Sequence, residues 1–309
     1  MENLLNILAD CKPHSMPNLT ALLTKTPQQI EQSIIALQKL GLNIKVDTIG
    51  VHLQPQLDLL DFQRISTALS TKHIFIKSVV DSTNAFLFRN LNQLKKGDFC
   101  IAEYQTAGRG RRGRQWFSPF AGQIMLSVYW NFAPNILING LSSVVGIAIA
   151  EALNHVTNNK VRLKWPNDLL LDGRKLGGIL IELAHQHNGL LNVIIGFGIN
   201  LSIGSKQQID QPWAELIEVL PQLDRNQLII EIMNNLYQTL PLFEQNGFSF
   251  FRQKWIELDA FLEQPIKVIS EKSEIQGISQ GVDNNGFLLV STKNGLLSFN
   301  AGEVSLRKQ

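Results

Sequence analysis

Residues 161–201, VRLKWPNDLLLDGRKLGGILIELAHQHNGLLNVIIGFGINL, decide the fold of this chain. The stretch consists of long apolar runs interrupted by Asp172-Gly173 and Asn188-Gly189, and both dipeptides favour the tight turns of β-hairpins. We therefore expect a β-meander of three strands, which cover Val161–Leu171, Leu176–Ala184 and Leu190–Leu201.

Strand and helix patterns flank this meander on both sides. The strands are expected at His73–Lys77, Phe99–Tyr104 and Ile124–Trp130, and the helices at Asn139–Val156, Asp224–Asn246 and Phe248–Leu258. The helix at 139–156 is apolar on nearly every side, which indicates a buried position. Residues 63–263 are therefore predicted to form one α/β domain (α+β, with a mixed sheet).

The first 62 residues predict a small helical unit. Helices are expected at Asn3–Ala9, Met16–Leu23 and Pro27–Leu40, short strands at Ile44–Val46 and Val51–Leu53, and a linking helix at Asp61–Ser70. Ser15 is placed to cap the second helix, and Thr26, with Pro27 and Gln29 after it, forms a capping-box pattern at the third. Three helices followed by a two-stranded wing predict a winged helix-turn-helix domain over residues 1–62.

The last part of the chain, residues 264–309, contains short, closely spaced strand patterns. They lie at Pro265–Ser270, Ile275–Val282, Phe287–Ser291, Leu296–Phe299 and Val304–Arg307. Such short strands, joined by Asn/Gly-rich turns, predict a small β-barrel.

Length and composition narrow the class of protein. With 309 residues and 44% hydrophobic residues, the chain is long enough for two or three domains with apolar cores. The formal net charge of +2 indicates neither a broadly basic nor a broadly acidic protein. Cys11 and Cys100 form no CxxC pair, and the sequence has neither a signal peptide nor a membrane-spanning run. We therefore expect a cytoplasmic protein with no membrane partner.

The segment Gly108-Arg109-Gly110-Arg111-Arg112-Gly113-Arg114-Gln115-Trp116 lies between two expected strands. Glycine permits a close backbone approach to a ligand, and arginine offers a permanent charge with planar donors for phosphate or carboxylate. This composition favours anion binding. A solvated basic loop or an RNA-contacting patch is the alternative, and the spacing of a P-loop is absent.

The first hairpin of the meander carries Lys164-Trp165-Pro166-Asn167-Asp168 and, beyond its turn, Lys175. Proline favours an edge or bulge position, where strand irregularities often form sites. Lys175 across the turn is expected to approach Asp168. A lysine there can neutralise charge on a phosphate, and the carboxylate can orient that lysine or bind a magnesium ion. A solvent-exposed ion pair on a surface hairpin is the alternative.

A third polar segment, Asp81-Ser82-Thr83-Asn84, opens an apparent helix at Ala85. Such residues at a helix start usually act as caps. The functional alternative is a group of neutral donors and acceptors for a polar ligand.

Taken in order, these segments resemble the catalytic domain of the biotin protein ligases. The resemblance rests on Asp81-Ser82-Thr83-Asn84, on residues 102–116 (AEYQTAGRGRRGRQW), on Lys164-Trp165-Pro166-Asn167-Asp168, on residues 174–180 (RKLGGIL) and on residues 196–200 (GFGIN). The predicted winged-helix unit and C-terminal barrel extend it over the whole chain. Both match the two-function bacterial form, which is also the biotin operon repressor, and this form implies an SH3-like barrel.

The resemblance implies an activity. Biotin and ATP, with Mg²⁺, give biotinyl-5′-AMP and pyrophosphate, and a lysine of the biotin carboxyl carrier protein of acetyl-CoA carboxylase then takes the biotinyl group. The implied partners also include operator DNA and a second copy of the chain, because the family's dimers form when the adenylate is bound.

The resemblance also implies site residues. The implied catalytic residues are Lys175, Arg111 and Asp168. The implied biotin-binding residues are Ser82, Thr83, Asn84, Gln105, Arg109, Gly110, Arg111 and Lys175. Adenylate binding falls to Gly108, Arg112, Gly113, Trp116, Lys164, Asn167 and Asn200, and Asp168 is the candidate protein ligand for magnesium.

The charge of residues 1–62 argues against the second function of this family. These residues contain four lysines and no arginine against six carboxylates, so the net charge is 4 − 6 = −2. DNA-binding domains usually present a basic surface to phosphates. The sequence thus leaves open both a ligase that is also a repressor and a ligase whose helical unit does not bind DNA. A lipoate–protein ligase, which shares the fold, is the third alternative.

Overall fold

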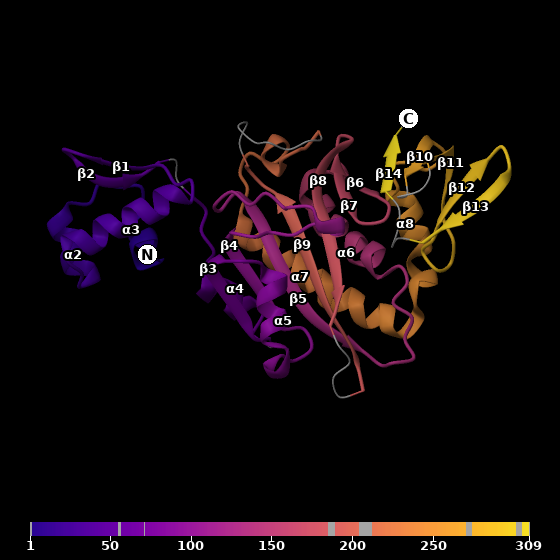
Figure 1. Ribbon diagram of the computed structural model, residues 1–309, viewed down its shortest axis with the longest axis horizontal. Coiled ribbons are helices and arrows are strands. Elements are labelled where there is room, and N and C mark those ends of the chain that lie inside the picture. Colours follow the sequence, from indigo (N-terminus) through magenta and orange to yellow (C-terminus); the bar gives the residue numbers. More distant parts are fainter. Residues whose placement is uncertain are drawn as a thin grey trace.

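The computed structural model describes residues 2–54, 57–70, 72–184, 189–203, 212–269, 274–300 and 305–308. These residues contain a two-stranded, a seven-stranded and a five-stranded sheet, which follow one another along the chain (Figure 1). The predicted turn residue Asn188 and the predicted strand ends Ser270 and Val304 lie outside the described residues.

The seven-stranded sheet forms the centre of the molecule (Figure 1). Its strands are β3 (Ile74–Val80), β4 (Phe99–Gln105), β5 (Gln123–Phe132), β6 (Val161–Lys164), β7 (Asp168–Leu171), β8 (Arg174–Leu183) and β9 (Leu191–Asn200). Their spatial order is β3-β4-β5-β9-β8-β7-β6. Only β3 and β4 are parallel, so the described sheet is mixed, as predicted.

The prediction of one continuous strand over Val161–Leu171 was wrong. The chain reverses at residues 165–167, and β6 pairs antiparallel with β7 so that Lys164 lies opposite Asp168. Pro166, which follows a cis peptide bond, lies in this turn and has no N–H to donate to a sheet ladder. The structure therefore has one more hairpin than predicted, and this hairpin carries three of the expected site residues.

Helices pack on both faces of the central sheet. On one face, α6 (Leu141–Thr157) and α7 (Arg225–Asn246) form the main core with alternate strand residues such as Leu126 and Val128 of β5. On the other face, α5 (Thr83–Arg89) packs over β4, β5 and β9, where Leu87 meets Tyr129. The core helix predicted at 139–156 is confirmed, since nearly all of α6 is buried.

Shorter helices complete the central unit. They are α4 (Phe62–Ala68), α8 (Arg252–Leu258) and the 3-10 turns Leu91–Gln93, Arg111–Gly113, Leu216–Glu218 and Phe248–Phe251. The helix predicted over Phe248–Leu258 is therefore a 3-10 turn that leads into a shorter α-helix.

The N-terminal residues form three helices and a two-stranded hairpin, at the left of Figure 1. The elements are α1 (Glu2–Leu8), α2 (Met16–Leu23), α3 (Pro27–Lys39), β1 (Ile44–Asp47) and β2 (Gly50–Leu53). The predicted caps are confirmed: Ser15 accepts a hydrogen bond from the N–H of Asn18, and Thr26 and Gln29 form a capping box. Ile30, Ile34 and Leu37 of α3 are buried in the core of this unit.

The segment that joins this unit to the central sheet is held by a buried ion pair. Arg225, at the start of α7, is fully buried and pairs with Glu103 of β4. Glu103 Oε1 accepts the backbone N–H of Leu60 at 2.6 Å, and Asp58 Oδ2 accepts the backbone N–H of Arg225 at 2.8 Å. Removal of one partner of a buried ion pair strongly destabilises a folded protein. These contacts therefore hold the joining segment against the central unit.

The C-terminal strands form one antiparallel sheet with the order β13-β12-β11-β10-β14, at the right of Figure 1. The strands are β10 (Pro265–Ile269), β11 (Glu274–Val282), β12 (Leu288–Thr292), β13 (Gly295–Phe299) and β14 (Ser305–Lys308). The predicted small β unit is thus present. In the part of the chain that the structure describes, no helix has both the length and the apolarity to cross a lipid bilayer.

Asp259 lies half-buried where α8 leads toward the C-terminal sheet. Its Oδ1 accepts the N–H of Phe261 at 2.8 Å, while Oδ2 has no hydrogen-bond partner among the described residues. Burial raises the pKa of this carboxyl from 3.8 to about 6, because the charged form is poorly solvated there. The folded state therefore binds the Asp259 proton more tightly than the unfolded state. The resulting stabilisation is complete below pH 4 and is lost as the pH rises through 6.

We predict that Asp259→Asn stabilises the protein at neutral pH, because the amide needs no proton to remain neutral. At pH 7.5 the free energy of urea-induced unfolding should exceed that of the wild type by about 3 kcal/mol at most, and the difference should vanish near pH 4. Asp172→Asn, at an exposed hairpin turn, is the matched control, for which we expect no such trend. A constant difference for Asp259→Asn between pH 4 and pH 7.5 would contradict the prediction.

Candidate functional site

The face of the sheet that packs under α5 carries polar side chains and glycines instead of a continuous apolar surface. Side chains alternate along a strand, so Ser127, between Leu126 and Val128 of the main core, points to the α5 face. Gly196 and Gly198 of β9 point to the same face, because their neighbours Ile195, Phe197 and Ile199 belong to the main core.

The two glycines leave room for larger side chains above the sheet. A Cβ atom on Gly196 would overlap the amide of Asn84, and one on Gly198 would overlap the indole of Trp116. The two glycines are two residues apart, so they are separated by about 7 Å along the strand. Asn84 and Trp116 therefore occupy adjacent places on one face.

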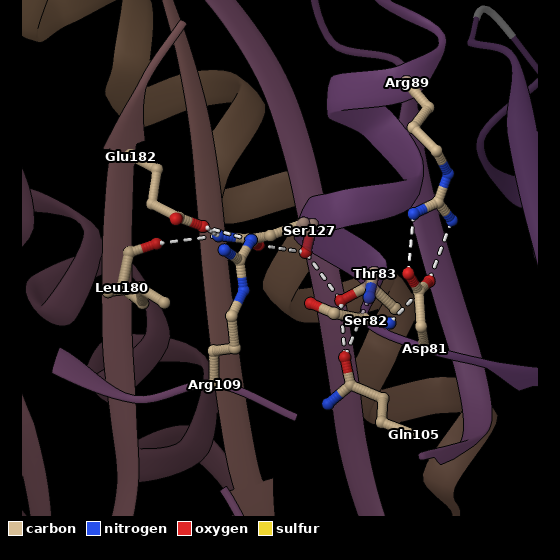
Figure 2. Close-up of polar contacts among 10 residues, drawn as sticks. Asp81, Ser82, Thr83, Arg89, Gln105, Arg109, Ser127, Leu180 and Glu182 are labelled. Carbon is tan, nitrogen blue, oxygen red and sulfur yellow. Dashed lines mark hydrogen bonds and ion pairs between the residues drawn. The ribbon is translucent and has the colours of Figure 1, made fainter. Parts of the chain in front are cut away.

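Four neutral polar side chains form a hydrogen-bonded group, here called the polar cluster: Thr83, Asn84, Gln105 and Ser127. Gln105 Oε1 accepts the backbone N–H of Thr83 at 2.8 Å and lies 3.2 Å from Thr83 Oγ1 (Figure 2). Ser127 Oγ lies 2.6 Å from Thr83 Oγ1 and donates to Asn84 Oδ1. Thr83, Asn84 and Ser127 are almost fully buried, so these hydrogen bonds define a fixed arrangement.

The cap interpretation of residues 81–84 does not account for this segment. Ser82 is the N-cap of α5, but its side chain makes no capping hydrogen bond. Asp81 instead pairs with Arg89 at 2.6 and 2.8 Å, and this hydrogen bonding lowers the pKa of Asp81 to about 2 (Figure 2). Thr83 and Asn84 therefore serve the cluster above the sheet, while Ser82 lies buried beside them at the start of α5.

The Gly/Arg segment folds into a compact loop. Its two arms pair through a bridge between Arg109 and Gln115, and the N–H of Gly110 donates to the carbonyl of Arg114 at 2.7 Å. Arg112 and Gly113 turn the chain with φ values of 57° and 72°. Glycine adopts this left-handed conformation readily, which explains its place at the turn.

Two arginines attach this loop to the sheet. Arg109 Nη2 lies 3.0 Å from Glu182 Oε2 of β8, and Arg111 Nη1 donates to Asn167 Oδ1 at 2.9 Å. Partial burial lowers the pKa of Arg111, because its charge is incompletely solvated. A partly desolvated guanidinium favours an incoming anion.

Lys164, Asp168 and Lys175 form the charged cluster. Asp168 Oδ1 lies 2.8 Å from Lys175 Nζ, and Asp168 Oδ2 lies 3.5 Å from Lys164 Nζ. Lys175 Nζ also lies 5.8 Å from the centre of the Trp116 ring. The extra hairpin brings these charges together, because it folds β7 between β6 and β8.

A chain of amides connects Trp116 to the backbone of Lys175. Trp116 Nε1 donates to Gln123 Oε1 at 3.1 Å, and Gln123 Nε2 donates to Asn200 Oδ1 at 2.7 Å. Asn200 Nδ2 in turn donates to the carbonyl of Ala214 at 3.1 Å and lies 3.4 Å from that of Lys175. Trp116 is therefore held between the polar and the charged clusters.

Comparison with known proteins agrees with this geometry. The sequence profile of the "Biotin/lipoate A/B protein ligase family" matches residues 76–200, and that of the "Biotin protein ligase C terminal domain" matches residues 261–307. The chain is 41% identical to "Bifunctional ligase/repressor BirA" of Salmonella typhimurium over 98% of this chain and 96% of that protein. The chain belongs to the biotin protein ligase family.

Two further relatives of this family are similar to the chain. "Biotin--[acetyl-CoA-carboxylase] ligase" of Paracoccus denitrificans is 31% identical over 72% of this chain and 96% of that protein. The structure titled "Biotin protein ligase from Aquifex aeolicus in complex with biotin and ATP" is 28% identical, with a TM-score of 0.67, over 77% of this chain and 99% of that one.

The structure brings most of the expected ligase-family residues together. Thr83, Asn84 and Gln105 lie in the polar cluster, and Lys164, Asp168 and Lys175 lie in the charged cluster. Arg109 and Arg111 contact Glu182 and Asn167, respectively. Trp116 and Asn200 are linked through Gln123. Gly108, Gly110, Arg112 and Gly113 shape the loop. A Cβ atom on Gly108 would overlap the carbonyl of Trp116, whose N–H donates to Gly108.

Sequence reasoning missed Ser127, Glu182 and Gln123. Ser127 and Glu182 lie within predicted strands, and Gln123 directly precedes one. The available signal was a polar residue within or next to an apolar strand, as for Ser127 and Gln123, since a buried polar side chain needs a partner.

The described residues give little support to a protein-held metal ion. No group of three or more His, Cys, Asp or Glu side chains comes together in the parts of the chain that the structure describes. Both oxygens of Asp168 face lysine ammonium groups, which is the arrangement of a carboxylate that orients lysines. Asp168 as it stands does not fit the role of a magnesium ligand.

Proposed function

We propose that this protein is an ATP-dependent biotin protein ligase. In the first step, the biotin carboxylate attacks the α-phosphorus of ATP, the bond to the β-phosphate breaks, and biotinyl-5′-AMP and pyrophosphate form. In the second step, a lysine amine of the biotin carboxyl carrier protein of acetyl-CoA carboxylase attacks the acyl carbon. The bond to AMP breaks, the amine loses a proton, and an amide forms.

The observation that carries this proposal is that a neutral polar cluster and a cationic cluster lie next to each other on one sheet face. A ureido ring needs hydrogen bonds and no charge, and Ser82, Thr83, Asn84 and Gln105 are assigned to bind it. The carboxylate and the α-phosphate repel each other, so the first step requires cations near the bond that forms. Lys175 and Arg111 are assigned to this role, with Asp168 orienting Lys175.

The remaining residues are assigned to the adenylate and its enclosure. Arg109, Gly110 and Arg111 would fold over the ligand together with Gly108, Arg112 and Gly113 of the same loop. Trp116, Lys164, Asn167 and Asn200 would contact or support the nucleotide side. A loop that closes excludes water from an anhydride that water would hydrolyse. Magnesium would enter with the phosphates of ATP.

The domain division that supports this function is residues 1–62, 63–263 and 264–309. We assign the first to a winged helix-turn-helix domain and the last to an SH3-like barrel. The pairing of two copies through the catalytic domain, when the adenylate is bound, completes the proposal.

We predict that the purified chain releases pyrophosphate from ATP when biotin is added. Lipoate should give no more than the background rate, because its dithiolane ring offers no N–H or carbonyl to the polar cluster. A coupled pyrophosphate assay with each acid at equal concentration measures this. Stimulation by lipoate alone would contradict the proposal and favour the lipoate–protein ligase alternative.

We predict that Lys175→Ala slows biotinyl-5′-AMP formation about 100-fold or more, since a positioned charge that stabilises a transition state contributes roughly this factor. Single-turnover formation of the adenylate is the measurement. Lys254→Ala, which removes the lysine of an exposed ion pair with Glu151, is the control. An unchanged rate in Lys175→Ala would remove this lysine from the reaction.

The N-terminal unit supports a second function, because its three helices and hairpin belong to a chain that matches a "ligase/repressor" over nearly its full length. We propose that this unit binds operator DNA. Gln28 and Gln32 are exposed on α3, and glutamine amides can pair with adenine in the major groove. The net charge of −2 implies few phosphate contacts and therefore a weak dependence of binding on salt.

We predict a gel shift of the biotin-operon promoter by this chain in the presence of biotin and MgATP. The shift should weaken when Gln28 and Gln32 are both replaced by alanine. Gln253→Ala, at an exposed position of α8, should leave it unchanged. The absence of any shift at micromolar protein would refute DNA binding and leave a ligase with a helical unit of another role.

A further inference from the structure

Glu182 of β8 connects two parts of the site that no sequence motif joins. Its Oε2 atom accepts a hydrogen bond from Asn84 Nδ2 at 2.7 Å. The same atom pairs with Arg109 Nη2 at 3.0 Å (Figure 2). We propose that Glu182 is a positioning residue: it orients the amide of Asn84 and thereby makes the polar cluster selective for a cyclic urea. This inference rests on the proposed function.

The direction of the Asn84 amide depends on its hydrogen-bond partners. An amide has a donating and an accepting end of nearly equal shape, and only its partners determine which way it points. An ionised carboxylate accepts hydrogen bonds and cannot donate them. Glu182 therefore requires the NH₂ group of Asn84 on its side. The carbonyl oxygen of Asn84 then faces Ser127.

This orientation determines the acceptor to which the Ser127 hydroxyl donates its proton. Ser127 Oγ is near two acceptors, Asn84 Oδ1 and Thr83 Oγ1, but it has one proton. Asn84 Oδ1 cannot donate, so Ser127 donates to it. The 2.6 Å contact with Thr83 is then a hydrogen bond only if the Thr83 hydroxyl supplies the proton. All the donated protons along this chain thus point toward Glu182.

Two groups at the end of this series of hydrogen bonds, Thr83 Oγ1 and the Gln105 NH₂ group, remain for a ligand. Thr83 Oγ1 lies 2.6 Å from Ser127 Oγ and 3.2 Å from Gln105 Oε1. Its one proton goes to Ser127, the closer oxygen, so its lone pairs remain for an N–H donor. Gln105 uses Oε1 for the backbone N–H of Thr83, so its NH₂ group is a donor, with Ser118 Oγ 3.5 Å away. One acceptor beside one donor complements a ring that has both an N–H and a carbonyl, as a cyclic urea does.

Arg109 balances the negative charge of Glu182. The Glu182 side chain is 26% exposed, and a carboxylate in such a place needs a cation or several donors. Arg109 supplies the cation from the Gly/Arg loop. The same residue that belongs to the loop over the ligand therefore also pairs with the carboxylate that orients Asn84.

The test uses the full-length chain and the Michaelis constants of biotin-dependent pyrophosphate release. Glu182→Leu removes the acceptor, so the Asn84 amide loses its preferred direction. The KM for biotin should rise about tenfold or more, the loss expected for a misdirected buried hydrogen bond, while the KM for ATP changes less than about twofold. Glu182→Gln keeps an accepting oxygen and should raise the KM for biotin only about threefold. Glu151→Gln, at an exposed ion pair with Lys254, is the control and should leave both constants unchanged.

A reciprocal exchange separates positioning from a general structural role. Asn84→Asp alone places two carboxylates together and should raise the KM for biotin about tenfold or more. The double variant Asn84→Asp/Glu182→Gln exchanges donor and acceptor across the contact and still presents an oxygen to Ser127. It should return the KM for biotin to within about threefold of the wild type.

The inference would be overturned by an equal rise in the KM values for both substrates in Glu182→Leu, or by no recovery in the double variant. An active wild type whose KM for biotin is unchanged by Glu182→Leu would also refute it, while leaving the proposed function intact. A wild type that releases no pyrophosphate with biotin would refute the proposed function itself.

Discussion

The site depends on the carboxylate of Asp168, which lies between the ammonium groups of Lys175 and Lys164. Without this carboxylate, two cations on the strands that flank β7 would repel each other. With it, Lys175 is held in one direction, toward the ring of Trp116. The hairpin of β6 and β7 exists at this place because Pro166 cannot continue a sheet ladder. The charge arrangement thus follows from the local backbone.

The rest of the site follows from the choice of residues on one face of the sheet. The opposite face is filled by large apolar side chains under α6 and α7. The α5 face has Gly196 and Gly198 at its centre, with Asn84 and Trp116 above them. Asn84 of the polar cluster and Trp116, whose ring centre lies 5.8 Å from Lys175 Nζ, therefore lie side by side on a rigid support. This arrangement suits a ligand with a neutral ring at one end and a carboxylate at the other.

The sequence was sufficient to predict the local features of the fold. Ser15, Thr26 and Gln29 determine helix starts through contacts within a few residues, and Asp172-Gly173 determines a turn in the same way. It was not sufficient at Val161–Leu171, where apolar residues on both sides of Lys164-Trp165-Pro166-Asn167-Asp168 suggested one strand and the effect of Pro166 was underestimated. For the site, the motifs identified Lys175, Asp168 and the Gly/Arg loop. Glu182 and Ser127 were missed, because a strand pattern gives the face of a residue but not its neighbours on other strands.

The buried pair of Arg225 and Glu103 shows the same limit of sequence-based prediction, since the two residues are far apart in the chain. Together they join the segment after the N-terminal unit to β4.

The central claim is the transfer of a biotinyl group to a protein lysine. Intact-mass spectrometry of a biotin carboxyl carrier domain, after incubation with this chain, biotin and MgATP, tests it most directly. The account predicts the addition of one biotinyl group to one lysine, dependent on ATP. An unmodified carrier domain, in the presence of active and folded protein, would contradict it.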